Sequence, residues 1–384
     1  MASLQVRHQR SCSLDKPWTT AAALESCDCL PTYNVVSRVD GKLVREVVGT
    51  DRAEAEKRLR TIEVHVDENR YEPPRAVRFE AYADQFVASL RRRSTTAAAY
   101  ETTFAYARRA FGRKYLAKLG PSDVRKMLEL IEKENRERNR EVSSTTLAKH
   151  LRQLSTVLEA GVAEGLLSVN PCKRLPRSQR PKVRKRRPAY FENAELVRLW
   201  RELEGRPVYL TAAKLAVTTG LRQGELAGMQ WDDVDLLAGE LHVRRQFTGG
   251  ELVDHPKDSD ARVVDLVPAA RGLLESWYAA TGDDGLVFEN EIGGYLDASN
   301  MRKVLYAAMT RAGIDRIGER GGTRDFHSFR HTFARVALEN GAQLEWVQAQ
   351  LGHSSITLTR DTYGHWSRAA EKREAERLEG AFAV

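Results

Sequence analysis

The feature that most constrains this chain is a set of polar residues near its C-terminal end. His327 and Arg330 lie three positions apart, which places both on one face of a helix, and His353 and Tyr363 follow closely. Arg222 stands apart, far upstream. Arginine binds phosphate oxygens bidentately, imidazole moves protons or donates hydrogen bonds, and a phenol attacks phosphorus. These residue types therefore suit phosphoryl transfer through a tyrosine nucleophile.

Four short segments place these residues in a wider pattern. They read Thr219-Gly-Leu-Arg222-Gln-Gly-Glu225-Leu, His327-Ser-Phe-Arg330-His-Thr-Phe-Ala, Leu351-Gly-His353-Ser-Ser and Asp361-Thr-Tyr363-Gly-His365. In this order and roughly at this spacing, they resemble the tyrosine recombinases, also called phage-type integrases. A single short motif matches by chance, whereas four in order form a specific signal. The resemblance is clear over residues 190–370 and looser over 75–175.

The resemblance implies a chemical role for four of these side chains. Tyr363 would be the nucleophile that attacks a DNA phosphodiester. Arg222 and Arg330 would hold the non-bridging oxygens of the scissile phosphate with their guanidinium forks. His327 would accept the tyrosine proton or hold the phosphate.

The resemblance also assigns positions around these four. His353 would act mainly as a hydrogen-bond donor to the phosphate, and Glu225 as a structural carboxylate that orients Arg222 or caps a helix. Lys257 matches the lysine position on the family's β-hairpin and would protonate the departing 5′ oxygen. His331 faces about a quarter-turn away from Arg330, so we assign it to structure or to a phosphate contact rather than to catalysis.

The charge balance favours a polyanionic partner, because 61 lysines and arginines outnumber 53 acidic residues and give a net charge of +8. No run is apolar enough to span a bilayer, and the first eight residues lack the apolar core of a signal peptide. A soluble intracellular protein is therefore expected. Four cysteines in a chain of this length do not make a disulfide scaffold.

The N-terminal region predicts a small domain over residues 1–72. Residues 1–30 read as irregular, whereas 32–48 read as a hairpin whose turn is Asp40-Gly41. A helix is expected over about 52–65. A small sheet with one packed helix looks like the arm-binding domain of larger integrases.

Cysteines and a histidine gather at the start of this region. His8, Cys12, Cys27 and Cys29 supply donor types that suit a tetrahedral structural zinc. The Cys-x-Cys spacing is tighter than usual in zinc sites, so unliganded thiols remain the alternative. The reaction implied by the resemblance requires no catalytic metal or other cofactor.

Residues 75–175 predict a helical domain. Four helices are expected between Phe79 and about Leu167. The last of them follows Ser143 and carries on one face Leu147, Leu151, Leu154 and Leu158. The region resembles the family's core-binding domain, which clamps one side of the DNA duplex.

A basic stretch joins this region to the next. Residues 173–187 contain no acidic residue, and a linker is expected over 176–188. Such a charge run is either a solvated linker or a segment that lies along DNA phosphates. Its place between two expected DNA-binding domains favours the second interpretation.

Residues 189–384 are expected to form the catalytic domain, mostly helical with one small inserted sheet. The expected fold class is mainly α with small β-sheets, in which a mixed α/β integrase-type catalytic domain follows the helical domain and a small α+β domain precedes both. Helices are expected near 194–203, 206–219, 223–230, 268–280, 299–312, 328–340 and 344–350, and strands near 240–247, 251–254 and 261–267.

The resulting hypothesis is a site-specific recombinase that integrates a phage or mobile element through a 3′-phosphotyrosyl intermediate. The resemblance implies double-stranded attachment sites as substrate, a homotetramer on DNA, and an accessory bending protein or excisionase. The expected location is the bacterial cytoplasm, at the nucleoid. Two alternatives are a type IB topoisomerase, which relaxes DNA without joining two sites, and a non-catalytic DNA-binding regulator on the same fold.

Overall fold

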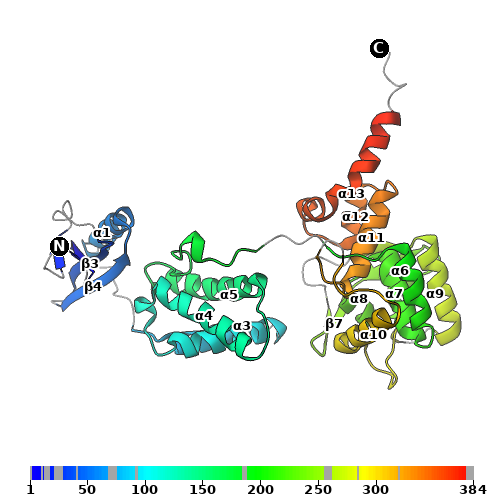
Figure 1. Ribbon diagram of the computed structural model, residues 1–384, viewed down its shortest axis with the longest axis horizontal. Helices are drawn as coiled ribbons and strands as arrows, with labels where there is room; N and C mark the ends of the chain where they lie inside the picture. Colours follow the sequence, from blue (N-terminus) through cyan, green and yellow to red (C-terminus); the bar gives the residue numbers. More distant parts are fainter. Residues whose placement is uncertain are drawn as a thin grey trace, which may run out of the picture. The chain divides into compact units, whose positions relative to one another are not determined.

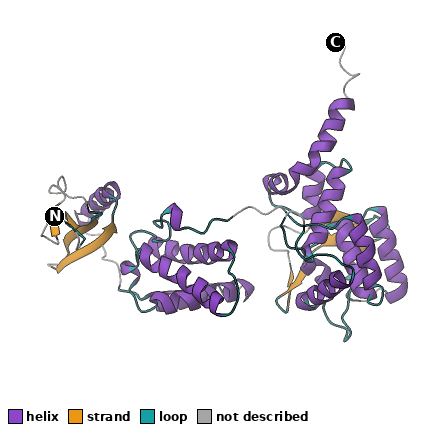
Figure 2. Cartoon of the chain, viewed as in Figure 1, coloured by secondary structure: helices purple, strands orange, loops and turns teal. Residues whose placement is uncertain are grey.

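The computed structural model describes residues 2–9, 12, 18–20, 29–39, 42–67, 76–90, 94–183, 188–254, 262–282, 285–318 and 321–377. The chain divides into two compact units, Met1–Arg184 and Lys185–Val384. Helices predominate in both, with small sheets near the N-terminus and within the second unit (Figure 1, Figure 2). The predicted fold class, mainly α with small β-sheets, is therefore confirmed.

The first unit begins with a four-stranded antiparallel sheet in the order β2-β1-β3-β4. The strands are β1 (Ser3–Arg7), β2 (Trp18–Thr20), β3 (Thr32–Val39) and β4 (Lys42–Gly49). Helix α1 (Arg52–Asp67) packs on the sheet, where Val6, Val35 and Ile62 are buried. The predicted hairpin and helix are confirmed, and the turn residues Asp40 and Gly41 lie outside the described residues.

The prediction that residues 1–30 are irregular is wrong, because β1 and β2 lie within them. Both strands are short, and the five-residue β1 is flanked by no turn signal. What fixes β1 in the sheet is its register against β3, in which Val6 lies opposite Tyr33. Pairing with a strand that follows much later in the chain is information that local sequence patterns do not carry.

Four helices follow within the same unit, namely α2 (Phe79–Ser89), α3 (Ser94–Phe111), α4 (Pro121–Glu137) and α5 (Ser144–Ala163). Helix α4 begins with a proline and the Asp123 carboxylate accepts the N–H of Gly120, while the Ser143 hydroxyl caps α5 by accepting from Thr146. Leu147, Leu154 and Leu158 are buried in the core between the helices. The four predicted helices are confirmed.

The second unit consists of eight helices and five strands among its described residues. The helices are α6 (Asn193–Leu203), α7 (Pro207–Thr219), α8 (Gln223–Gly228), α9 (Pro268–Thr281), α10 (Ala298–Arg311), α11 (His327–Glu339), α12 (Leu344–Leu351) and α13 (Ile356–Arg377). The strands are β5 (Val234–Asp235), β6 (Glu240–Val243), β7 (Arg245–Thr248), β8 (Glu251–Asp254) and β9 (Arg262–Asp265). Each predicted helix of this region is found.

The prediction of a single inserted sheet is wrong. The strands form a three-stranded sheet, β5-β6-β9, and a separate hairpin, β7-β8. The expected strand over 240–247 is broken at Arg244, so its halves pair with different partners. The break turns β7 toward α8, where Gly224 and Gly228 approach the β7 backbone closely.

Two hydrophobic cores organise the second unit. The larger lies between α6 to α10 and the three-stranded sheet and includes Leu199, Leu215 and Val264. The smaller is built from α11, α12 and α13 and includes Leu338, Leu351, Tyr363 and Trp366. Tyr363 is thus part of a packed core. In the part of the chain that the structure describes, no helix is long and apolar enough to cross a membrane.

Candidate active site

Among the described residues of the second unit, Arg330 is the most deeply buried cation, with 1% of the residue exposed. Its Nη1 donates to the carbonyl oxygen of Gly220 at 2.7 Å, and its Nη2 donates to that of Leu351. Its Nε has no hydrogen-bond partner among the described residues. Burial, and next the charge of Arg222, lower the pKa of Arg330 to about 9, so the guanidinium remains cationic at neutral pH. A buried cation with an unused donor suits an anionic ligand.

The end of α7 is shaped to present the carbonyl that binds Arg330. Gly220 caps this helix in the left-handed conformation, with φ of 71°. A Cβ atom at this position would lie 2.6 Å from the ring of Phe333. Only glycine fits both restraints, which explains the Thr-Gly-Leu-Arg222 sequence at this corner.

Glu225 connects two arginine side chains. Its carboxylate accepts two hydrogen bonds from Arg262, at 2.9 and 2.8 Å, and one from Nη1 of Arg222 at 2.8 Å. It also accepts from the backbone N–H of Arg222 at 2.7 Å. Burial would raise the pKa of Glu225, but the hydrogen bonds and charge of Arg262, with the charges of Arg222 and Arg330, hold it at about 2. The carboxylate thus orients Arg222, the role expected from the sequence.

Arg262 is a member of this cluster that sequence analysis missed. It lies at the start of β9, and its Nε donates to the carbonyl oxygen of Gln350 at 3.2 Å. Its position in the segment that resembles the family's β-hairpin was the available signal. With Arg222 and Arg330, it gives three guanidinium groups around the one carboxylate of Glu225, so the cluster has excess positive charge.

Tyr363 lies on α13 with 1% of the residue exposed, and its hydroxyl is 2.7 Å from Nδ1 of His331. Its ring is stacked against His353, with centroids 6.0 Å apart, and against Trp366, with centroids 5.6 Å apart. Burial raises the pKa of Tyr363 to about 12, although the charges of Arg330 and Arg222 act in the opposite direction.

The contact between Tyr363 and His331 was not expected from the sequence, which assigned His331 to structure or to a phosphate contact. Tyr363 packs in the smaller core beside Ala334 and Leu338 of α11. Residues 331, 334 and 338 form one stripe of that helix, so the side that receives Tyr363 is the side that carries His331. Burial, and next the positive field of neighbouring His327 and Arg330, lower the pKa of His331 to about 3.

His327 begins α11 and is exposed. Its ring is perpendicular to that of His331, with centroids 4.7 Å apart. Although the residue is exposed, loss of water around its imidazole ring, and next the charge of Arg330, lower the pKa of His327. An exposed imidazole therefore lies beside the one that contacts Tyr363, and both are neutral at pH 7 because both pKa values are lowered.

His353 follows Gly352, which ends α12 in the left-handed conformation with φ of 60°. The Nδ1 atom of His353 lies 2.8 Å from the hydroxyl of Thr359. Burial, and next the charge of Arg330, lower the pKa of His353 to about 3. The neutral ring suits a hydrogen-bond donor better than a proton carrier.

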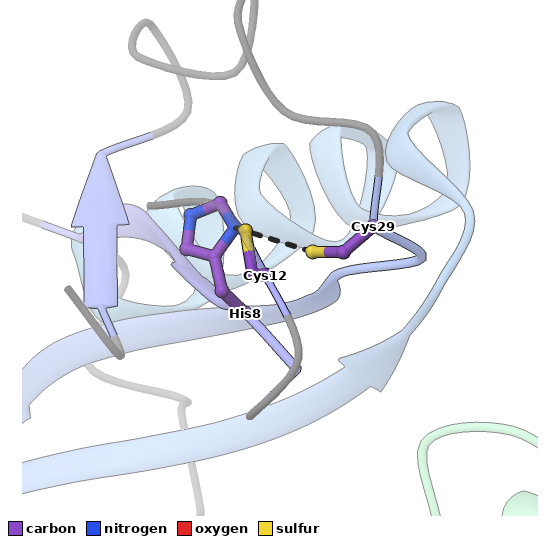
Figure 3. Close-up of side chains that lie close together, drawn as sticks. All are labelled: His8, Cys12 and Cys29. Carbon is purple, nitrogen blue, oxygen red and sulfur yellow. Dashed lines mark hydrogen bonds between the residues drawn. The ribbon is translucent and has the colours of Figure 1, made fainter. Parts of the chain in front are cut away.

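Two predicted residues lie outside the described part of the chain. Lys257 falls in the segment 255–261 that joins β8 to β9, and Cys27 precedes Cys29. Their assignments stay predictions. In the first unit, the three other residues of the predicted zinc site come together, since the ligand atoms of His8, Cys12 and Cys29 all lie within 4.8 Å of one another (Figure 3).

Comparison with known proteins identifies several integrases and recombinases as relatives. The family model described as "Phage integrase family" matches residues 190–369. A "Tyrosine recombinase XerC-like" protein of Caldanaerobacter subterraneus is 28% identical over 62% of this chain and 67% of its own length. The prophage integrase IntR of Escherichia coli is 28% identical over 58% of this chain and 57% of its length. The ICEBs1 integrase of Bacillus subtilis is 27% identical over 62% and 66%.

Solved structures share the fold. The Tn1549 transposon integrase in complex with transposon right end DNA has a TM-score of 0.63 at 18% identity, covering 79% of this chain and 99% of that one. A lambda integrase tetramer bound to a Holliday junction has a TM-score of 0.57 at 20% identity, covering 86% and 93%. The three curated relatives described above are matched over 57 to 67% of their length.

Proposed function

We propose that this chain is a site-specific DNA recombinase of the tyrosine recombinase family, the enzymes that break and rejoin DNA, and its similarity to that family supports the proposal. Its reaction proceeds through a 3′-phosphotyrosyl intermediate on Tyr363. Its biological role is the integration of a phage or another mobile element, in keeping with the integrase names of several relatives.

The observation that carries this proposal is the convergence at the end of α12. The carbonyl oxygens of Leu351 and Gly352 accept hydrogen bonds from Arg330 and Arg222, respectively. The next residue, His353, stacks on Tyr363. One short turn therefore holds two phosphate-binding arginines beside the phenol. A phosphate on the arginines would be positioned for attack by the tyrosine.

In the proposed reaction, the Tyr363 oxygen attacks phosphorus and the bond to the 5′ oxygen breaks. Arg222 and Arg330 bind the non-bridging oxygens, and His353 donates a hydrogen bond to them. Lys257 gives a proton to the departing 5′ oxygen. A 5′ hydroxyl from the second DNA site then attacks the phosphotyrosine and releases Tyr363. Because the covalent bond conserves the energy, neither ATP nor a cofactor is required, as in the family.

The phenol must lose its proton during attack. A pKa of about 12 leaves on the order of one molecule in 10⁵ ionised at pH 7. His331 Nδ1, at 2.7 Å, is the nearest acceptor, and His327 lies beside it. A bound phosphate offsets the arginine charges that lower the pKa of both imidazoles, so DNA binding itself makes the acceptors more basic.

The proposed substrate is double-stranded DNA at attachment sites, exchanged by a homotetramer with help from a bending protein or an excisionase. We assign 1–72 to arm-site binding, 75–175 to core-site binding, 176–188 to a linker along DNA phosphates, and 189–384 to catalysis. The reaction would take place in the bacterial cytoplasm at the nucleoid. The predicted structural zinc has no part in it.

Two other functions use the same fold. A type IB topoisomerase would cleave DNA and relax it without joining two sites. A non-catalytic regulator would bind DNA without cleaving it. The convergence of Arg222, Arg330 and Tyr363 disfavours the regulator, since a binding protein has no use for a phenol aligned beside two phosphate clamps.

The decisive experiment traps the covalent intermediate. The protein is incubated with fragments of its source genome in buffer with EDTA, the reaction is stopped with SDS, and protein-linked DNA is sequenced. Tyr363→Phe is the test variant, and Tyr306→Phe is the matched control because Tyr306 lies outside the site, under Arg316.

Adducts from the wild type and Tyr306→Phe, but not from Tyr363→Phe, at a unique sequence support the proposal. Adducts at many unrelated sequences, with relaxation of supercoiled plasmid, indicate the topoisomerase. DNA binding by folded wild-type protein without any adduct on its attachment site refutes the catalytic role.

A further inference from the structure

Three soft or borderline metal donors meet beside the N-terminal sheet. His8 directly follows β1, Cys12 lies in the loop after it, and Cys29 lies shortly before β3 (Figure 3). The His8 Nδ1 atom is 3.6 Å from Sγ of Cys12 and 3.4 Å from Sγ of Cys29. Side chains from separate segments thus direct their ligand atoms to one point.

The separations match those around a tetrahedral zinc ion. A Zn–N bond of about 2.05 Å and a Zn–S bond of about 2.3 Å at the tetrahedral angle place nitrogen and sulfur about 3.6 Å apart. Hydrogen bonding explains the arrangement less well, because Nδ1 of an imidazole has one lone pair or one hydrogen and here faces both Cys12 and Cys29. A cation at the centre satisfies all three atoms.

The opposite edge of the His8 ring is held as in a metal site. His8 is buried, and its Nε2 lies within hydrogen-bond distance of the Thr19 hydroxyl on β2. A histidine that binds a metal donates its other ring N–H to such a partner, which fixes the tautomer and the ring orientation. With Nε2 protonated toward Thr19, the Nδ1 lone pair points at the two sulfur atoms.

The surrounding backbone arranges the donors without a metal. The N–H of Cys12 donates to the carbonyl oxygen of Gln9 at 3.0 Å. The Gln9 side chain donates to the carbonyl oxygen of Leu30 at 3.2 Å, which holds the loop of Cys12 against the segment of Cys29. Preorganised donors lower the entropic cost of binding an ion.

The fold around these residues has a small core. The buried hydrophobic residues under the sheet are Val6, Tyr33, Val35, Val48, Ala55 and Ile62. Small folds with a core of this size commonly depend on a metal or a disulfide for stability, because their surface is large relative to their core. An ion here would join the end of β1 to the start of β3 and, through Thr19, would fix β2.

We propose that His8, Cys12 and Cys29 bind one structural Zn²⁺ that stabilises the N-terminal sheet. Thiolate and imidazole donors select zinc over magnesium or calcium. Cys27 was the fourth ligand expected from the sequence, and the three described donors carry this assignment without it. The ion has no role in DNA cleavage.

The test measures zinc in full-length protein purified without a polyhistidine tag. We expect about one zinc per chain, and loss of it in Cys12→Ser and Cys29→Ser. Cys172→Ser is the matched control, because Cys172 is a buried thiol of the same unit, outside the cluster. Thr19→Val should retain the fold and weaken zinc affinity by about 10- to 100-fold.

A spectroscopic measurement covers the case in which cysteine variants fail to fold. Wild-type protein is stripped of metal under reducing conditions and titrated with Co²⁺, and thiolate-to-cobalt charge transfer with intense visible bands identifies tetrahedral sulfur ligation. Wild-type protein with less than about 0.2 zinc per chain and no such spectrum overturns the proposal. Full zinc content in the Cys12→Ser, Cys29→Ser double variant, or a Cys12–Cys29 disulfide in the native protein, also overturns it.

Discussion

Glu225→Gln tests whether one buried carboxylate holds the cluster of Arg222, Arg262 and Arg330 together. Glu225 is 2% exposed and accepts hydrogen bonds from Arg222 and from Arg262. Glutamine has nearly the same shape but no charge, and its amide nitrogen cannot accept a hydrogen bond. The variant therefore leaves the guanidinium groups crowded together without a counter-charge.

The structure sets the size of the expected loss of folding stability in Glu225→Gln. The pKa of Glu225 falls from 4.5 to about 2 on folding, and each unit corresponds to about 1.4 kcal/mol, so ionisation stabilises the fold by about 3 kcal/mol at pH 7. Breaking a buried ion pair costs about 3–5 kcal/mol in general, which agrees. Because the folded pKa is lowered, the stabilisation is complete above pH 4.5 and is lost as the pH falls toward 2. At pH 3 about 1.4 kcal/mol remains.

The assay is urea unfolding followed by tryptophan fluorescence, at pH 7 and again at the lowest pH at which the wild type stays folded. Of the six tryptophans all but Trp18 lie in the second unit, so the signal reports on the unit that contains Glu225. Glu275→Gln is the matched control, because Glu275 pairs with Arg271 on an exposed helix face and should cost less than about 1 kcal/mol. DNA cleavage by Glu225→Gln should fall by about 10²-fold, since Arg222 loses its orientation.

Equal stability of Glu225→Gln and Glu275→Gln at pH 7 would refute the reasoning. A difference between wild type and Glu225→Gln that grows as the pH falls would also refute it, because the linkage sign would then be opposite.

Three further outcomes are expected. His331→Leu should slow single-turnover DNA cleavage by about 10²–10⁴-fold while DNA binding is retained. The cleavage rate of the variant should rise tenfold per pH unit between pH 6 and 9, because the Tyr363 phenol, with a pKa of about 12, must then ionise without an acceptor. A cleavage rate that does not change with pH, like that of the wild type, would contradict this role of His331. Gly220→Ala should lower the free energy of unfolding by about 1–3 kcal/mol, because its Cβ would lie 2.6 Å from Phe333. Gly293→Ala is the control, also at positive φ but with no atom closer than 4.0 Å, and should lower the free energy of unfolding less. Equal losses of unfolding free energy in the two variants would argue against the clash. DNA affinity, measured by fluorescence anisotropy, should fall linearly with salt on a double-logarithmic plot if the basic linker contacts phosphates, and a slope unchanged by neutralising residues 184–187 would exclude that contact.

The sequence was sufficient for the features that depend on local patterns. Periodic leucines such as Leu154 and Leu158 indicated α5, and the four motifs gave the order of Arg222, Arg330, His353 and Tyr363 along the chain. The resemblance to the tyrosine recombinases rests on those motifs, and the comparisons found the same resemblance. Local patterns succeed here because helix faces and end signals are encoded within a few residues.

Features that depend on pairing between distant segments were not predictable in the same way. Which histidine meets Tyr363 is decided by the side of α11 on which α13 packs, and the motif shared by His327 and His331 does not contain that information. Arg262 reaches Glu225 across 37 positions of the chain. The break at Arg244, which separates two sheets, is set by the partners of β6 and β7 rather than by the residues within them.

The stacking of Tyr363 restricts how its phenol can move. The ring lies nearly parallel to those of His353 and Trp366, at 11° and 17°, inside the core shared by α11, α12 and α13. A change of side-chain rotamer would take the ring out of this stack and open the core. Any displacement of α13 that keeps this core closed would therefore carry the Tyr363 phenol as a rigid part of the backbone.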